Sequence, residues 1–192
     1  MQNFKSIRNI ANIVSGYTFR GAIKEQRDSD LFVLQSKNIN DSLYIDENKL
    51  TETQVDLSHT KAFAKDGDVA IGTRGSFKSA VLKTTKRVIA SSSVYLLRIN
   101  PASKCLPEYL SIYLNSPSGQ KDISLLFTGA AIKFILRKDL ESLPIPIPPI
   151  DQQEKIVALF NNISEQEKIL KRKSELNKAV LNSMIYEIVR RK

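Results

Sequence analysis

The chain has 192 residues, 42% of them hydrophobic, and its 29 Lys and Arg against 20 Asp and Glu give a formal net charge of +9. This length and apolar content predict one globular domain with at most an appended element, and they exclude intrinsic disorder. No run approaches the roughly 18 to 20 apolar residues that cross a bilayer, and the N-terminal MQNFKSIRNI lacks a signal-peptide core, so we expect a cytoplasmic protein with no membrane partner.

The first 150 residues carry a mixture of strand and helix patterns. They open with a glycine-flanked loop, SGYTFRGA at 15–22. Short β-branched runs between polar turns then predict five strands, at 31–34, 68–71, 80–82, 88–90 and 94–99. Two helical patches follow, at 106–117 and 137–143. Because strands and helices do not alternate regularly, we predict an α+β fold with a mixed α/β domain over residues 1–150.

A proline-rich run, LPIPIPPI at 143–150, closes this first part, since it forbids helix and favours extended backbone. No Pro or Gly occurs after it, and the sequence predicts one helix over 151–192, opened by a capping box of Asp151 and Glu154. A 4-3 spacing defines one seam on this helix, interrupted by the polar Glu167, Ser174 and Asn177. The apolar seam residues, which we predict to mediate dimerisation, are Ile156, Phe160, Ile163, Leu170, Leu181, Met184 and Ile188.

About 38 helical residues in this segment would extend about 57 Å, more than the diameter of the preceding domain. It cannot bury its seam against its own domain alone, so the pattern predicts a partner helix from a second copy or from another chain. The alternative is a terminal helix that folds back as a hairpin at residues 171–173.

Basic side chains concentrate in the segment IGTRGSFKSAVLKTTKR, and no acidic residue occurs between positions 69 and 107. Residues 1–150 contain 20 basic and 14 acidic side chains, and residues 151–192 contain 9 and 6. Lys and Arg interleaved with Gly, Ser and Thr suit contact with a phosphate backbone, whereas the alternative is a solvated basic face. Within this segment the turn GTRGS would expose Arg74, whose planar fork fits a guanine edge or a phosphate.

Four segments together resemble the DNA-specificity subunits of type I restriction-modification systems. They are SGYTFRGA, DGDVAIGTRGSFKSAVL, PEYLSIYLNS and FTGAAIKFILRKDLESLPIPIPPIDQQEKIV, and the proline junction in the last is the most distinctive. The resemblance implies a target-recognition domain that reads one half of a split DNA site, and a spacer helix that pairs in an antiparallel coiled coil and docks methyltransferase subunits. It also implies that this chain is not an enzyme and holds no cofactor, since S-adenosylmethionine, ATP and Mg²⁺ serve the partner modification and restriction subunits.

The sequence departs from the family pattern in one respect, because a full specificity subunit carries two recognition domains and two spacer helices. Here there is one of each. We therefore expect a half-subunit that homodimerises through its C-terminal helix and reads a bipartite palindromic site. A truncated product or a fragment is the competing explanation.

The residue types that suit DNA contact give a set of candidates, chosen on chemistry because recognition loops differ among family members. Asn38 can make a bidentate contact to adenine, and Lys133 is expected to contact phosphate. The predicted DNA-binding residues are Tyr17, Arg20, Lys37, Asn38, Thr73, Arg74, Ser76, Lys78 and Lys133.

Two other function classes compete with DNA reading. A module that binds RNA or an acidic protein, with the helix as an assembly arm, remains the alternative. An intrinsic nuclease or methyltransferase is the weakest interpretation, because His59 and Cys105 stand 46 positions apart and no phosphate-binding or catalytic motif occurs. We therefore expect no metal site and no catalytic residue.

Overall fold

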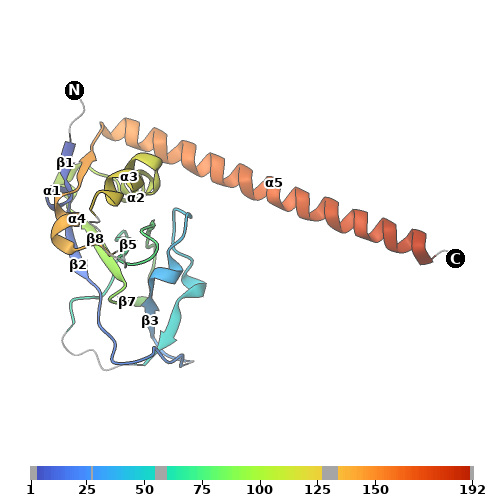
Figure 1. Ribbon diagram of the computed structural model, residues 1–192, viewed down its shortest axis with the longest axis horizontal. Helices are drawn as coiled ribbons and strands as arrows, with labels where there is room; N and C mark the ends of the chain where they lie inside the picture. Colours follow the sequence, from blue (N-terminus) through green and yellow to red (C-terminus); the bar gives the residue numbers. More distant parts are fainter. Residues whose placement is uncertain (1–3, 27, 55–59, 127–133, 191–192) are drawn as a thin grey trace. The chain divides into compact units, whose positions relative to one another are not determined.

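The computed structural model describes residues 4–26, 28–54, 60–126 and 134–190 (Figure 1). The chain divides into two compact units, Met1–Glu154 and Lys155–Lys192. In its described part, the first unit contains three small sheets, four short α-helices and the first turn of the last helix. The second unit is the remainder of that helix.

The largest sheet has four strands in the order β2-β8-β5-β6, all antiparallel. Its strands are β2 (Ala11–Ser15), β5 (Val69–Gly72), β6 (Ser79–Val81) and β8 (Val94–Ile99). Every residue of β5 and β6 is buried, which explains why both read as continuous apolar or small-residue runs. β8 is a central strand and pairs with β2 on one side and with β5 on the other.

A second sheet has the order β4-β3-β7, and it mixes the two pairing directions. β3 (Leu31–Leu34) runs antiparallel to β4 (Thr51–Thr53) but parallel to β7 (Arg87–Ala90). In the parallel pair Leu34 lies beside Ala90, so β3 and β7 end at the same edge of the sheet. The chain that follows β3 and the chain that follows β7 therefore leave from one place.

The third sheet joins the N-terminal segment to the proline-rich run. β1 (Phe4–Ser6) pairs antiparallel with β9 (Pro144–Pro146), and α1 (Ile7–Ile10) links β1 to β2. Prolines fit here because a two-stranded sheet leaves one side of each strand without a ladder partner. Between them, Ile145 is fully buried.

The remaining helices of the first unit are α2 (Pro107–Asn115), α3 (Pro117–Ser124) and α4 (Arg137–Ser142). α2 is fixed to β6 by polar contacts of Ser79 and Asn115. The Ser79 main-chain N–H donates to Asn115 Oδ1 at 2.8 Å, and Asn115 Nδ2 donates back to the Ser79 carbonyl at 2.7 Å. Single turns of 3-10 helix occur at Ser36–Asn38, Glu47–Lys49 and Pro101–Ser103.

The predicted α+β class is confirmed, as are all five predicted strands and both predicted helices, with ends shifted by up to two residues. The sequence interpretation missed β1, α1, β2, β4, α3 and β9. β1, β4 and β9 are only three residues long and, unlike the equally short β6, are not buried throughout, and α1 has only four residues, so neither a period nor an apolar run is visible. α3 is a polar segment, PSGQKDIS, whose start is fixed by the Ser116 hydroxyl, which accepts from the Gly119 N–H at 3.1 Å.

The last helix, α5 (Ile150–Arg190), is continuous, so the hairpin alternative at 171–173 is wrong (Figure 1). It begins one residue earlier than predicted, and the Pro149 carbonyl accepts from the N–H groups of Gln152 and Gln153. Asp151 therefore lies in the first turn rather than at the cap, where its charge favours the helix dipole. No described helix combines the length and hydropathy needed to cross a membrane.

Gln153 fixes this helix start within the first unit. The side chain is fully buried. Its Nε2 donates to the carbonyls of Lys104 (2.9 Å) and Pro148 (2.8 Å), and its Oε1 accepts from the Leu106 N–H at 2.9 Å. One amide thus satisfies three main-chain groups from the segment before α2 and from the proline run, which explains why a glutamine follows the prolines in this junction.

In the second unit a single helix carries many exposed apolar side chains. Six of the seven predicted seam residues are exposed, from Ile156 at 38% to Ile188 at 71%, and Phe160 is half-buried. A lone helix of this kind is marginal in water unless an apolar face is covered. The antiparallel pairing of this helix stays a prediction.

Candidate nucleic-acid interface

The loops that follow β2, β3 and β5 meet at the turn between β7 and β8, here called the serine turn (Ser91–Ser93). β3 and β7 end side by side, and the last residue of β5, Gly72, lies opposite Val94, the first residue of β8. β2 ends opposite Tyr95, the next residue of β8. The chain segments that follow β2, β3, β5 and β7 are thereby collected at one edge of the two sheets.

Main-chain hydrogen bonds tie three of these loops to the serine turn. The Tyr17 N–H donates to the Ala90 carbonyl at 2.7 Å, and the Ser92 N–H donates back to the Tyr17 carbonyl at 2.8 Å. The Ser91 N–H donates to the Leu34 carbonyl at 2.8 Å, and the Thr73 N–H to the Ser93 carbonyl at 2.9 Å. These bonds do not depend on side-chain identity.

Hydroxyl groups add a second set of contacts around the serine turn. Ser93 Oγ accepts from the Ser36 N–H at 3.1 Å, which fixes the first residue of the 3-10 turn after β3. The hydroxyls of Ser91 and Ser93 are hydrogen-bonded to each other at 2.8 Å. Ser93 therefore holds the loop after β3 through its side chain and the loop after β5 through its carbonyl.

Two glycines allow the backbones to approach this closely. A Cβ at Gly16 would lie 1.9 Å from the Ser91 carbonyl oxygen, and a Cβ at Gly72 would lie 2.2 Å from the Ser76 carbonyl oxygen. Gly75 has a different role: its φ is +72°, and the Ser76 N–H donates to the Arg74 carbonyl at 2.9 Å, which closes a γ-turn. Arg74 and Ser76 stand on either side of Gly75, and both are exposed.

The predicted DNA-binding residues divide by exposure. Arg20, Lys37, Arg74 and Ser76 lie at the surface, and none of the three cations has an ion pair within the described ranges. Lys78 is half-buried, and its Nζ lies 2.7 Å from Asp41 Oδ1, so its charge is partly compensated. Lys133 lies outside the described residues.

Three other candidates have structural partners instead. Asn38 is only 9% exposed; its Oδ1 accepts from the Gln35 N–H at 2.9 Å and its Nδ2 donates to the Lys49 carbonyl at 2.7 Å, so the amide edge assumed for adenine is already used. Thr73 is 4% exposed and donates to the Ser92 carbonyl. The half-buried ring of Tyr17 packs edge-on against Phe19, with centroids 5.0 Å apart. The Asn38 amide and the Thr73 hydroxyl are therefore already used within the fold.

The basic segment predicted from the sequence is split between two ends of β7. Arg74 and Lys78 lie on the loop at the serine turn, but Lys83, Lys86 and Arg87 belong to the connection that enters β7 at its other end. The ammonium of Lys86 lies 4.5 Å from the centroid of the Phe32 ring. The pKa of Lys83 is raised, chiefly by a hydrogen bond with Tyr44 and to a smaller extent by the nearby carboxylate of Glu108.

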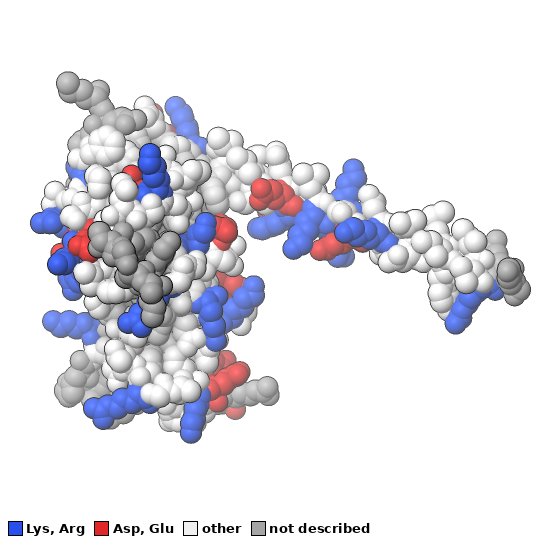
Figure 2. Space-filling model, in the orientation of Figure 1, with Lys and Arg blue, Asp and Glu red and all other residues white. Residues whose placement is uncertain are grey.

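Arg87 at that far end lies over the Phe63 ring and 3.5 Å from Asp30. These cations are partly engaged within the fold. In the view of Figure 2, Lys and Arg are spread around the first unit with fewer acidic groups between them.

Sequence reasoning missed the serine turn. The signal was present as three consecutive serines, Ser91 to Ser93, between two predicted strands. The sequence did not reveal that β3 pairs in parallel with β7, because this pairing is long-range. That pairing brings the loop after β3 to the serine turn.

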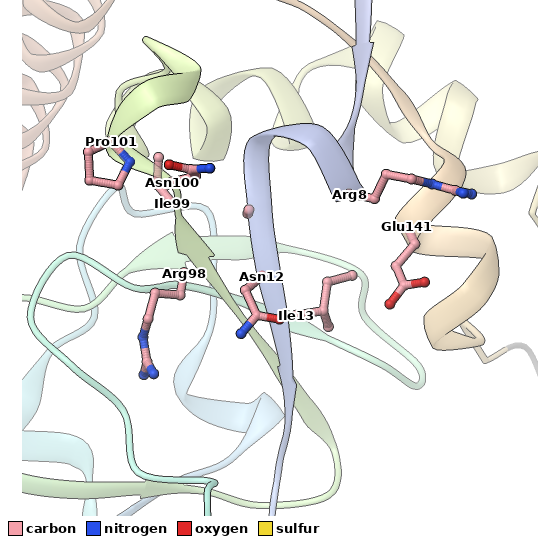
Figure 3. Close-up of a pocket in the computed structure, with 9 residues that line it drawn as sticks. Arg8, Asn12, Ile13, Arg98, Ile99, Asn100, Pro101 and Glu141 are labelled. Atoms are coloured by element: carbon pink, nitrogen blue, oxygen red, sulfur yellow. The ribbon is translucent and has the colours of Figure 1, made fainter.

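The described residues offer little for catalysis. A depression of about 520 Å³ beside β2 and β8 is lined by Arg8, Ala11, Asn12, Ile13, Arg98, Ile99, Asn100, Pro101 and Glu141. Arg98 is bound to Asp68, with Nη2–Oδ2 at 2.8 Å, and Glu141 to Arg137. In Figure 3 Arg8 and Glu141 lie to one side and Asn12 and Arg98 to the other, and the polar groups do not converge.

Metal-binding and nucleophilic groups are equally sparse in the described part of the chain. It brings together no group of three His, Cys, Asp or Glu side chains suited to a metal ion. Burial raises the pKa of Cys105 to about 12, which keeps this thiol protonated at neutral pH.

The sequence model of one protein family, the type I restriction modification DNA specificity domain, matches residues 2–178. The chain belongs to this family. No curated protein sequence matches this chain significantly.

Solved structures share the fold. A structure concerned with complex assembly and conformational transition of the type I R-M system aligns with a TM-score of 0.70 at 21% identity, over 95% of this chain and 43% of that one. The HsdS subunit from Thermoanaerobacter tengcongensis gives 0.62 at 21% identity, over 89% and 39%. The S subunit from M. genitalium gives 0.59 at 15% identity, over 93% and 43%. The specificity domain thus spans less than half of each of these solved chains.

Proposed function

We propose that this chain is a non-catalytic DNA-reading subunit of a type I restriction-modification system, in which the loops at the serine turn contact duplex DNA. The family match carries the proposal. The arrangement of exposed, unpaired cations in the described residues supports it, since Arg20, Lys37 and Arg74 all lie on loops that start at this turn. A polyanion is the partner for which such uncompensated charges are suited.

On the loops at the serine turn, Arg74 is the residue that we propose contacts a base. It stands at the corner of the Gly75 γ-turn, projects from a loop tied to the serine turn, and has no ion pair in the described residues. The planar guanidinium matches the O6 and N7 edge of guanine with two parallel hydrogen bonds, so less freedom is lost per bond formed. Arg20 and Lys37 are proposed phosphate contacts, and the Ser76 hydroxyl is a short donor beside Arg74.

The test of the whole proposal is selection from a randomised duplex library, with the chain alone and with its modification subunits. We expect enrichment of a defined motif whose affinity falls steeply as salt increases. No enriched motif in either case would refute the proposal. Tighter binding of single-stranded RNA than of duplex DNA, at two salt concentrations, would favour the alternative of an RNA-binding module.

Replacing Arg74 by Ala should weaken binding to the selected sequence by about 1–3 kcal/mol and relax the preference at one base pair. Titration of duplexes that carry each of the four base pairs at every motif position measures this. Arg8→Ala removes the same charge from α1, at the opposite end of β2 from the serine turn, and is the matched control. An equal loss on every duplex would make Arg74 a phosphate contact instead.

For the long helix we propose self-association. Two copies paired through the seam of α5 would present two recognition domains, and closed two-fold symmetry would make the recognised site bipartite and palindromic. The exposed seam residues support this, because one helix cannot cover its own apolar face. Sedimentation of the full chain tests it: a monomer at micromolar concentration, with no partner helix, would refute self-association.

Docking of the modification and restriction subunits is proposed for a second stripe on α5, formed by Ile169, Leu176 and Val180. All three are between 49% and 59% exposed. They lie roughly 110° around the helix from the nearby seam residues, at about 100° per residue. A seam-paired helix would leave this stripe uncovered. S-adenosylmethionine, ATP and Mg²⁺ would then be bound by these partners, in the cytoplasm, and not by this chain.

A further inference from the structure

The seam of α5 is symmetric about position 172. Its ten positions run from Ile156 to Ile188 with alternating steps of four and three residues, and each has a counterpart equally far on the other side of 172. α5 is helical without interruption across all of them. The order of apolar and polar residues follows the same symmetry, except for the pair Leu170 and Ser174.

This symmetry defines a register for two antiparallel copies. In an antiparallel coiled coil, an a position of one helix packs in the same layer as a d position of the other. If the copies cross at 172, the outer layers pair Ile156 with Ile188, Phe160 with Met184, and Ile163 with Leu181. Each of these layers occurs twice, once at each end, and all six are apolar on both sides.

The inner layers contain the polar seam residues. Glu167 faces Asn177, and an amide can donate to a carboxylate. Leu170 faces Ser174 in two symmetry-related layers, the ones in which an apolar residue meets a hydroxyl. The crossing also brings Lys171 of each copy near Lys173 of the other, so attraction comes from the six outer layers and not from the centre.

Other arrangements match less well. A shift of one heptad in one direction sets Phe160 opposite Asn177 and Ile163 opposite Ser174. A shift in the other direction sets Glu167 opposite Met184 and leaves Ile156 and Phe160 without a layer. A parallel, in-register pair would place Glu167 against its own copy, and like charges in a buried layer are costly.

We propose that α5 binds a second copy of this chain in the antiparallel register that crosses at position 172. The proposal rests on the proposed self-association and adds which residues face one another. It also gives the polar seam residues a role, because Glu167 and Asn177 reject shifted registers. A shift of one heptad in either direction buries at least one of them against an apolar side chain.

Cross-linking of the full chain through introduced cysteines tests the register. Ile163→Cys combined with Leu181→Cys places thiols in one layer of the proposed pair. Within a single helix these positions are about 27 Å apart, so a short bis-maleimide cannot join them in one chain. The native Cys105 is buried with its pKa raised to about 12, so it does not compete for the reagent.

We expect the double variant Ile163→Cys with Leu181→Cys to give a covalent dimer at least tenfold faster than the controls. Ile163→Cys with Ile188→Cys reports one shifted register, and Ile156→Cys with Leu181→Cys reports the other. Ile163→Cys alone reports a parallel pair. Faster cross-linking in any control would overturn the register.

Circular dichroism and sedimentation accompany each cysteine variant, so that a failure to fold is recognised. A helical dimer that cross-links in none of the variants refutes the register alone. A wild-type monomer refutes self-association as well.

Discussion

Ile163→Glu is expected to dissociate the dimer. The substitution puts a carboxylate into an apolar layer at both ends of the paired helices, because the two-fold axis repeats the change. Loss of two buried isoleucines alone weakens association by about 3–6 kcal/mol, which is roughly 10²- to 10⁴-fold in Kd. Sedimentation of the full chain over a range of concentrations measures the shift, and binding to a duplex with two half-sites should fall in parallel.

Ile169→Glu is the matched control for this result. It introduces the same charge six residues further along the same helix, at a side chain that is 59% exposed and lies outside the seam. The dimer should persist, while co-purification with the modification subunit should decrease. If both variants dissociate the dimer to the same degree, the paired surface is not the 4-3 seam.

Gln153→Ala should lower the free energy of unfolding by about 2–4 kcal/mol. The amide is fully buried and binds three main-chain groups, and its removal leaves the Leu106 N–H and the Lys104 and Pro148 carbonyls without these partners. Each such group costs about 1–3 kcal/mol when water cannot replace the partner. Urea unfolding of the full chain, followed by near-ultraviolet circular dichroism of the tyrosines, reports this loss.

The neighbouring Gln152 supplies the comparison. Its side chain is exposed, so Gln152→Ala should change the stability by less than about 0.5 kcal/mol. Equal effects of the two substitutions would mean that helix propensity, and not the buried hydrogen bonds, explains the first. A stability loss confined to Gln153→Ala would identify the glutamine of the proline junction as the residue that fixes the start of α5.

The elements that the sequence predicted are those with a long pattern or with a short apolar run between polar turns. β8 and the long helix were recognisable because their patterns extend over several residues, and β3, β5, β6 and β7 because they are bounded by polar turns. β1 and β9 were not, since this pair forms only because the ends of the first unit meet. Local pattern carries no information about such long-range pairing.

In the candidate site, too, local residue chemistry could be read from the sequence but long-range contacts could not. Arg20, Lys37, Arg74 and Ser76 were chosen from residue chemistry, and the structure gives them exposed positions on loops that meet. Asn38 was chosen for the same reason and is instead a buried part of a 3-10 turn. Its carbonyl partner, Lys49, lies eleven residues further along, and no spacing rule indicates that contact.

The loops at the serine turn are held chiefly by peptide groups, at Tyr17, Ala90, Leu34 and Thr73, and by glycines that give room for them. Main-chain hydrogen bonds of this kind form whatever exposed side chains the loops carry. Exposed residues on these loops can therefore be exchanged by mutation with little loss of folding free energy; under the proposed DNA contact, such exchanges would change the target sequence while the fold is kept. A side chain at Gly16 or Gly72 would instead clash with a main-chain carbonyl oxygen and displace the loops.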